Sequence, residues 1–99
     1  MTYEMLVAMN VTDADAYAKY RDAIAPVLSR FGGGFRYDFE VNRTLTVDPV
    51  HPVNRVFAIF FEDEVACKNF FVDQAYLSAK QRYYTGAVDG FTVIAEYSR

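Results

Sequence analysis

The chain has 99 residues, a formal net charge of −3 at pH 7 and a single cysteine. This length predicts one domain spanning residues 1–99. A nucleic-acid-binding domain usually carries a basic stripe, and the acidic balance argues against such a partner. The apolar runs are much shorter than the roughly 20 residues needed to cross a bilayer, so we expect no membrane partner either.

Hydrophobic residues make up 53% of the sequence and aromatic residues 17%. A small monomer cannot easily bury that much apolar surface, so we expect a shared interface or an apolar pocket to cover the excess. Cys67 cannot form an internal disulfide, which fits a reducing compartment. Because the N-terminus also lacks the basic start and apolar run of a signal peptide, we expect a cytoplasmic protein.

Residues 3–11 are apolar on both faces of a two-residue repeat, which predicts a central β-strand. Thr12 is expected to begin a helix, with Asp15 completing a capping box. An apolar stripe at helical spacing continues this helix, and Pro26 is expected to kink or interrupt it. The glycines at 32–34 are expected to end it, because glycine readily takes the left-handed conformation.

Residues 35–47 are expected to form a second strand, whose alternating pattern is typical of a half-exposed sheet edge. In a regular strand Arg36, Asp38 and Glu40 share one face, and the aromatic residues between them share the other. Two prolines then predict a turn at 48–52.

Residues 54–61 predict a third strand, again apolar on both faces and therefore central. A helix is expected from Asp63, and Asp73 is the expected N-cap of a further short helix. A last strand at 90–97 completes the order β-α-β-β-α-β. That order predicts an α+β, ferredoxin-like sandwich with a four-stranded antiparallel sheet. The helices of such a fold cover one sheet face, so we expect a second copy of the chain to cover the other.

Three segments are similar to a known family: VTDADAYAKYRDAIAPVLSRFGG at 11–33, NRVFAIFFEDEVACKNFF at 54–71 and DQAYLSAKQR at 73–82. Through them the chain resembles the domain-of-unknown-function family numbered 1330, within the dimeric α+β barrel superfamily. In that family a tyrosine precedes an arginine in the second helical region, here Tyr76 and Arg82. The resemblance covers nearly the whole chain and implies a ferredoxin-like fold and a homodimer formed through facing sheets.

The resemblance implies no particular activity. Distant members of the superfamily include cofactor-independent monooxygenases, muconolactone isomerases and haem-handling enzymes, which is an analogy at the level of the fold.

Tyrosines on the helical stripes are the most suggestive candidates for substrate binding. The group comprises Tyr17, Tyr20, Tyr76, Tyr83 and Tyr84, and several of these are expected to face the sheet. Phenols in that place can donate hydrogen bonds to a carbonyl or a developing oxyanion. The alternative is an aromatic core whose hydroxyls reach the surface or a backbone partner.

Charged residues supply further candidates. Arg36 and Asp38 could orient a substrate carboxylate or take up a proton, or could be solvated charges on an edge strand. Arg82 and Arg21 could each clamp a ligand carboxylate, or make surface ion pairs. His51, the one histidine, could act as a general base or a haem ligand, but its position in a turn favours an ordinary loop residue.

One histidine and one cysteine far apart provide no zinc-ligand spacing, so we expect no metal and no cofactor. Two functions remain open. The first is a monooxygenase- or isomerase-like enzyme for a small aromatic or carboxylate metabolite, which requires a cavity of roughly 300 Å³ or more between helices and sheet. The second is a non-catalytic dimeric module that binds a metabolite or a protein.

Overall fold

The computed structural model describes residues 1–46 and 51–99, so the expected turn at 48–52 lies mostly outside the described residues. Four strands, β1 (Tyr3–Val11), β2 (Gly34–Glu40), β3 (Arg55–Phe61) and β4 (Val88–Ser98), form one sheet. The sheet is antiparallel, in the order β2-β3-β1-β4. The predicted central and edge positions are confirmed.

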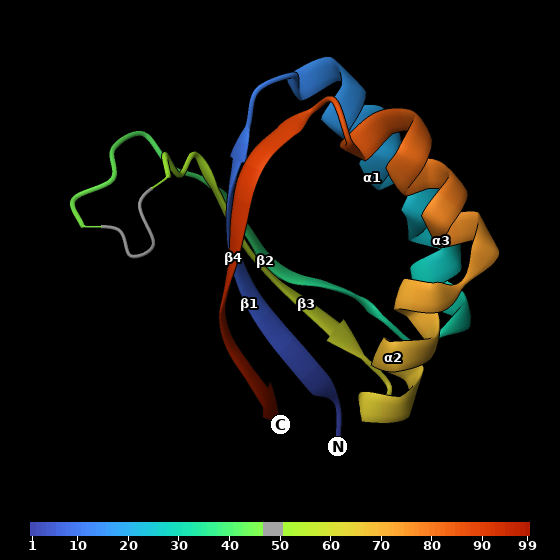
Figure 1. Cartoon of the computed structure of the whole chain (residues 1–99). Helices are drawn as coiled ribbons and strands as arrows, with labels where there is room; N and C mark the ends of the chain where they lie inside the picture. Colours follow the sequence, from blue (N-terminus) through green and yellow to red (C-terminus); the bar gives the residue numbers. More distant parts are fainter. Residues whose placement is uncertain (47–50) are drawn as a thin grey trace.

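The helices all lie on one face of the sheet, as Figure 1 shows. They are α1 (Ala14–Arg30), α2 (Glu64–Val72), α3 (Gln74–Ala79) and the π-helical turn η1 (Lys80–Tyr84). The core lies between the two layers, and its sheet side comes from alternate residues of the central strands, such as Met5, Val7, Phe57 and Ile59. The α+β, ferredoxin-like fold is therefore confirmed.

The start of α1 differs from the expected capping box. Oδ1 of Asp13 accepts a hydrogen bond from the backbone N–H of Ala16 at 3.1 Å, so Asp13 is the N-cap. The hydroxyl of Thr12 instead donates to the carbonyl oxygen of Ala87 at 3.3 Å. The carboxylate one residue later reaches the third helical N–H more directly, which is why it takes the capping position.

Pro26 lies inside α1, which runs unbroken from Ala14 to Arg30, so the expected kink or interruption does not take the form of an interruption. The proline is exposed and removes one backbone donor, and the helix continues beyond it to Arg30. The helix ends where the glycines predicted, since Gly32 has a φ of +65°. A Cβ atom at Gly33 would lie 2.5 Å from the carbonyl oxygen of Phe60, so glycine lets the chain pass close to β3 there.

The second helical region contains more segments than the sequence predicted. Asp63 caps α2 by accepting a hydrogen bond from the N–H of Ala66 at 2.8 Å. Asp73 caps α3, as predicted, by accepting from the N–H groups of Ala75 and Tyr76. The expected short helix is thus α3 followed by the wider turn of η1.

A β-bulge in β2 overturns the expected arrangement of its side chains. Phe35 lies opposite Ile59, but Tyr37 lies opposite Ala58, so Arg36 is the extra residue. An extra residue reverses the alternation of side chains beyond it. Arg36 therefore does not share a face with Asp38 and Glu40. The strand also ends at Glu40, earlier than the expected 47.

No helix among residues 1–46 and 51–99 is both long enough and apolar enough to cross a membrane.

Candidate functional site

A cavity of about 180 Å³ lies between the helices and the sheet. The cavity lies in the region where the tyrosines were expected. Its volume is smaller than the roughly 300 Å³ that the enzyme hypothesis required. Aromatic rings from both layers occupy much of the space between them. The lining residues are Met5, Val7, Met9, Tyr17, Tyr20, Ile24, Phe35, Phe57, Ile59, Phe70, Phe71, Tyr76, Lys80, Tyr84, Phe91 and Val93.

Four phenols are the main polar groups of this lining. Tyr17 and Tyr20 come from α1, Tyr76 from α3 and Tyr84 from η1. The ring of Tyr20 is at the centre of the group, with centroids 5.8 Å from Tyr17, 6.5 Å from Tyr76 and 5.0 Å from Tyr84. The predicted placement of Tyr17, Tyr20 and Tyr76 opposite the sheet is therefore found.

Burial raises the pKa of every phenol in this group. The pKa of Tyr84 is raised to about 12. Burial, followed by the neighbouring Tyr76, raises the pKa of Tyr20 well above its usual range, and burial also raises the pKa of Tyr76. Burial raises the pKa of Tyr17 even though the nearby charge of Arg21 acts against it. All four phenols are protonated near neutral pH, so they can donate hydrogen bonds but cannot serve as bases.

The exposed residues of the lining, Lys80, Phe91 and Val93, mark the side on which the cavity meets solvent, and we call this side its mouth. Phe91 and Val93 project from β4 toward the helix side, and their side chains remain 58% and 37% exposed. Lys80 of η1 also lines the cavity and is exposed. Of the described residues that line the cavity, Lys80 alone carries a formal charge.

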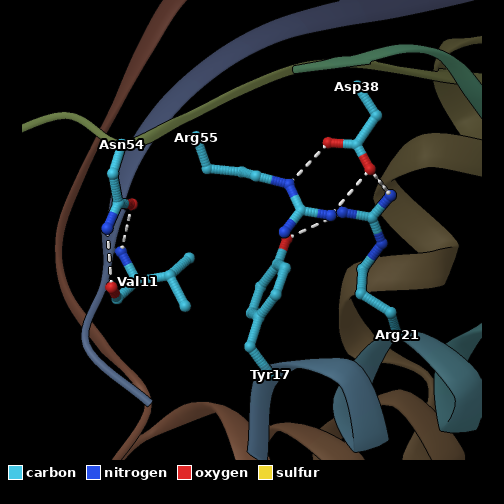
Figure 2. A network of polar contacts seen from close by, with 6 residues as sticks. All are labelled: Val11, Tyr17, Arg21, Asp38, Asn54 and Arg55. Carbon is cyan, nitrogen blue, oxygen red and sulfur yellow. Dashed lines mark hydrogen bonds and ion pairs between the residues drawn. The ribbon is translucent and has the colours of Figure 1, made fainter. Parts of the chain in front are cut away.

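Asp38 lies outside the cavity, at the centre of an ion-pair network (Figure 2). Oδ1 and Oδ2 accept hydrogen bonds from Nε and Nη2 of Arg55, both at 2.8 Å, and Oδ2 also accepts from Nη2 of Arg21 at 2.8 Å. Nη1 of Arg21 donates to the hydroxyl of Tyr17 at 2.9 Å. The hydrogen bond from Arg55 is the largest influence on the pKa of Asp38 and, with the charge of Arg21, lowers it despite partial burial.

Arg36 lies on the opposite sheet face, where it joins a second ion-pair cluster. Its Nε donates to Oε1 of Glu4 at 2.6 Å, while Oε2 of Glu4 accepts from Tyr97 and from Nη1 of Arg99 at 3.4 Å. The side chain of Glu4 is 0% exposed although the helices do not cover this face. Arg36 and Asp38 therefore do not form one patch, because the bulge separates them.

Arg82 is exposed on η1, where its guanidinium lies 5.3 Å from the ring centroid of Tyr83. It does not line the cavity. Nε2 of His51 is 2.7 Å from the hydroxyl oxygen of Thr92 on β4, so this histidine is held against the sheet rather than exposed in a turn. Neither residue joins the tyrosine group.

Cys67 is buried, with its Sγ 3.8 Å from Sδ of Met5. Burial raises the pKa of its thiol to about 11. Outside the undescribed residues 47–50, no group of three or more histidine, cysteine or acidic side chains is placed to hold a metal ion.

Lys80 was missed as a lining residue by reasoning from sequence. A signal was present, because Tyr76, Lys80 and Tyr84 recur every four residues, a spacing that keeps side chains on one helix face. The wider turn of η1, which the sequence did not predict, helps to keep Tyr84 on that face.

One protein family matches residues 2–97, which is almost the whole chain, and its description is Domain of unknown function (DUF1330). The chain belongs to this family. None of the curated proteins matches this DUF1330 domain.

Solved structures resemble the DUF1330 domain in fold. A protein of unknown function from Rhodopseudomonas palustris, RPA0582, has a TM-score of 0.79 and 21% identity, covering 94% of this chain and 78% of its own. A dabb family protein with a ferredoxin-like fold from Mesorhizobium loti has a TM-score of 0.66 and 14% identity, over 99% of this chain and 96% of its own. A dimeric ferredoxin-like protein of unknown function from Bacteroides fragilis has a TM-score of 0.62 and 11% identity, over 99% and 96%. At these identities the likeness concerns the fold.

Proposed function

We propose that the protein is a homodimer in which each subunit binds one small, single-ring metabolite between its helices and its sheet. The observation that carries the proposal is the cavity of about 180 Å³ with four phenol groups in its lining. Thioether and aromatic side chains form most of the remaining wall, so the site favours an apolar ligand with few polar atoms.

The volume limits the size of the ligand. An apolar cavity of about 150 Å³ is enough to hold a molecule of the size of benzene. A cavity of about 180 Å³ therefore accepts one ring with a short substituent. Larger molecules, such as fused-ring cofactors, need the roughly 300–1,000 Å³ of ordinary ligand pockets.

Hydrogen-bond donors around the cavity favour a ligand that carries an acceptor oxygen. Tyr20, Tyr76 and Tyr84 have raised pKa values and remain protonated, which makes them donors at neutral pH. These groups favour binding over proton abstraction, because a general base needs a pKa near the working pH. We therefore favour the binding module over the enzyme.

Methionine methyl NMR tests the location of binding. The chain has three methionines, of which Met5 and Met9 line the cavity and Met1 is 89% exposed. Titration with phenol or benzamide is expected to shift the methyl signals of Met5 and Met9 and to leave that of Met1 unchanged. Equal shifts of all three signals, or none at millimolar probe concentrations, would contradict the proposal.

A pair of matched variants controls this experiment. Val93→Phe places a ring at the mouth of the cavity, where the native side chain is 37% exposed and the added ring has room. It is expected to abolish the methyl shifts. Val72→Phe makes the same change at a residue of α2 that is 70% exposed and outside the lining, so binding is expected to persist.

The sheet face opposite the helices supports the homodimer. Beyond the bulge, Tyr37 and Phe39 project from this face with 51% and 56% of their surface exposed, and their rings stack with centroids 6.1 Å apart. Ile94 adds a side chain that is 54% exposed. Exposed large apolar side chains on one sheet face mark an interaction surface, and a second copy in facing orientation covers it symmetrically. The related fold from Bacteroides fragilis is described as dimeric.

Light scattering at micromolar concentration tests the dimer. The native chain is expected to show twice the mass of one subunit. Phe39→Asp is expected to give the mass of one subunit, because a charge in an apolar interface loses its hydration. Val65→Asp, at a residue of α2 that is 65% exposed, should leave the dimer intact. A native monomer would exclude the dimer.

An isomerase- or monooxygenase-like enzyme is the second candidate function, in which the phenols act as hydrogen-bond donors and not as bases; the cavity of about 180 Å³ restricts it to single-ring substrates. Buried donors of this kind stabilise a developing oxyanion. Tyr20→Phe is then expected to lower kcat on single-ring lactones or hydroquinones while leaving the melting temperature unchanged. If this change leaves turnover unaffected, the phenol of Tyr20 has no role in the reaction.

A further inference from the structure

The charge distribution of the cavity points to the polar end of its ligand. The wall consists of thioether, aliphatic and aromatic groups with phenol hydroxyls, and Lys80 is an exposed residue of the same lining. Lys80 makes no ion pair with any described residue. Its Nζ lies 5.9 Å from the ring centroid of Tyr84, which also lines the cavity.

The backbone conformation of η1 sets this arrangement. An α-helix advances by one turn in 3.6 residues, so side chains four apart drift by roughly 40° around the axis at each step. The backbone N–H of Thr85 donates to the carbonyl oxygen of Lys80 at 3.1 Å, which closes a π turn. The wider turn reduces the drift and keeps Tyr84 over the cavity with Tyr76 and Lys80. Single π turns occur frequently at functional sites.

We propose that the ligand is a single-ring monocarboxylate whose carboxylate pairs with Lys80 at the mouth while its ring occupies the cavity. This inference rests on the proposed binding function and narrows it to a chemical class. An unpaired carboxylate inside an apolar wall loses its hydration at a high cost in free energy. At the mouth the carboxylate keeps contact with water and meets the one cation of the lining.

One ammonium group also argues for a single charge on the ligand. Phosphate is usually bound by several donors, such as a cluster of arginines or the N-terminal N–H groups of a helix. The described mouth residues comprise one cation beside Phe91 and Val93. A carboxylate with one negative charge matches this mouth better than a phosphate.

Two pairs of probes with the same shape test the inference. Benzoate and benzamide differ in charge at nearly constant size, as do cyclohexanecarboxylate and cyclohexanecarboxamide. Dissociation constants come from the Met5 and Met9 methyl shifts at pH 7 and low ionic strength. Each acid is expected to bind roughly threefold to fivefold more tightly than its amide, the range of a partly exposed ion pair. Added salt is expected to reduce this difference.

Three variants assign the preference to Lys80. Lys80→Gln is expected to bring each acid to the affinity of its amide, and Lys80→Arg to retain the preference. Lys68→Gln removes the same charge from an exposed residue of α2 and is expected to change nothing.

The outcomes separate this inference from the function on which it rests. Binding of acid and amide with equal affinity, or a preference that survives Lys80→Gln, would overturn the inference and leave the small-molecule site standing. If none of the four probes shifts the Met5 and Met9 signals, both the site and the inference are overturned.

Discussion

Nε of Arg36 donates a hydrogen bond to Oε1 of Glu4 at 2.6 Å, across the sheet face that the helices leave uncovered. Tyr97 and Arg99 complete a single layer of side chains over this carboxylate. Burial alone would raise the pKa of Glu4, but the hydrogen bonds from Tyr97 and Arg36 and the charge of Arg99 outweigh it and lower the pKa. A carboxylate thus remains ionised on a largely apolar face.

The low pKa of Glu4 makes its contribution to stability depend on pH. A carboxyl group whose pKa is lower in the folded state than in the unfolded state stabilises the folded state. This contribution to the unfolding free energy is fully present above the unfolded pKa of about 4.3, and it is lost as pH falls through the folded pKa. Denaturant titrations at fixed protein concentration should therefore give a difference in unfolding free energy between wild type and Glu4→Gln that is largest near neutral pH. The difference should shrink on acidification below about pH 4. A difference that stays constant to pH 2 would contradict the prediction, and Glu62→Gln, at an exposed residue, is the control.

Asp38 is predicted to couple energetically to Arg55. The two side chains form a bidentate pair with both distances at 2.8 Å, but the carboxylate side chain is 28% exposed and water screens the pair. A double-mutant cycle with Asp38→Asn and Arg55→Gln is expected to give a coupling free energy of about 1 kcal/mol. The same cycle between Asp38 and Arg30, which pairs with Asp73 instead, should give none.

Asn54 acts as a strand partner for the end of β1. Its Oδ1 accepts from the backbone N–H of Val11 at 2.7 Å and its Nδ2 donates to the carbonyl oxygen of Val11 at 2.7 Å (Figure 2). Asn54→Ala leaves both backbone groups without these bonds and should lower the unfolding free energy by about 1–3 kcal/mol. Asn42→Ala, at an exposed position, is expected to have little effect. If Asn54→Ala and Asn42→Ala are equally stable, water replaces the hydrogen bonds that the Asn54 amide makes with the backbone of Val11.

Two glycines are predicted to respond oppositely to substitution by alanine. At Gly33 the new Cβ atom would lie 2.5 Å from the carbonyl oxygen of Phe60, a backbone atom that cannot move without displacing β3. At Gly86 it would meet nothing within 4 Å, and the φ angle there is not positive. Thermal unfolding should show a large loss of stability for Gly33→Ala and a gain of up to about 1 kcal/mol for Gly86→Ala. A well-folded Gly33→Ala with native stability would refute the close approach.

The Cys67 thiol is predicted to react only when the protein opens. Its side chain is 5% exposed, and burial, followed by the charges of Glu96 and Glu64, raises its pKa to about 11. Alkylation by iodoacetamide at pH 8 should be much slower in the native protein than in urea, because both the exposure and the thiolate fraction are lower. Mass spectrometry measures both rates, and equal rates would contradict the buried position.

Much of the cavity wall was predictable because helical spacing alone places side chains on one side of a helix. Tyr17, Tyr20 and Tyr76 occupy the apolar stripes of their helices, and the structure finds all three in the wall. The network of Asp38 with Arg21 and Arg55 was not predictable, because it joins three elements whose approach depends on packing. The Thr12 cap was wrong for a more local reason, since the carboxylate of Asp13 competed for the same N–H groups.

The sequence by itself determined the α+β order of elements, the central and edge strands and the side of each helix that is buried. These features depend on hydrophobic periodicity, which is local. Only the tertiary structure decided that a bulge at Arg36 turns it toward Glu4 while Asp38 faces the helices. It also decided that the space among the tyrosines measures about 180 Å³ and opens beside Lys80. Strand register and cavity volume depend on how distant side chains pack, and no local pattern in the chain encodes that packing.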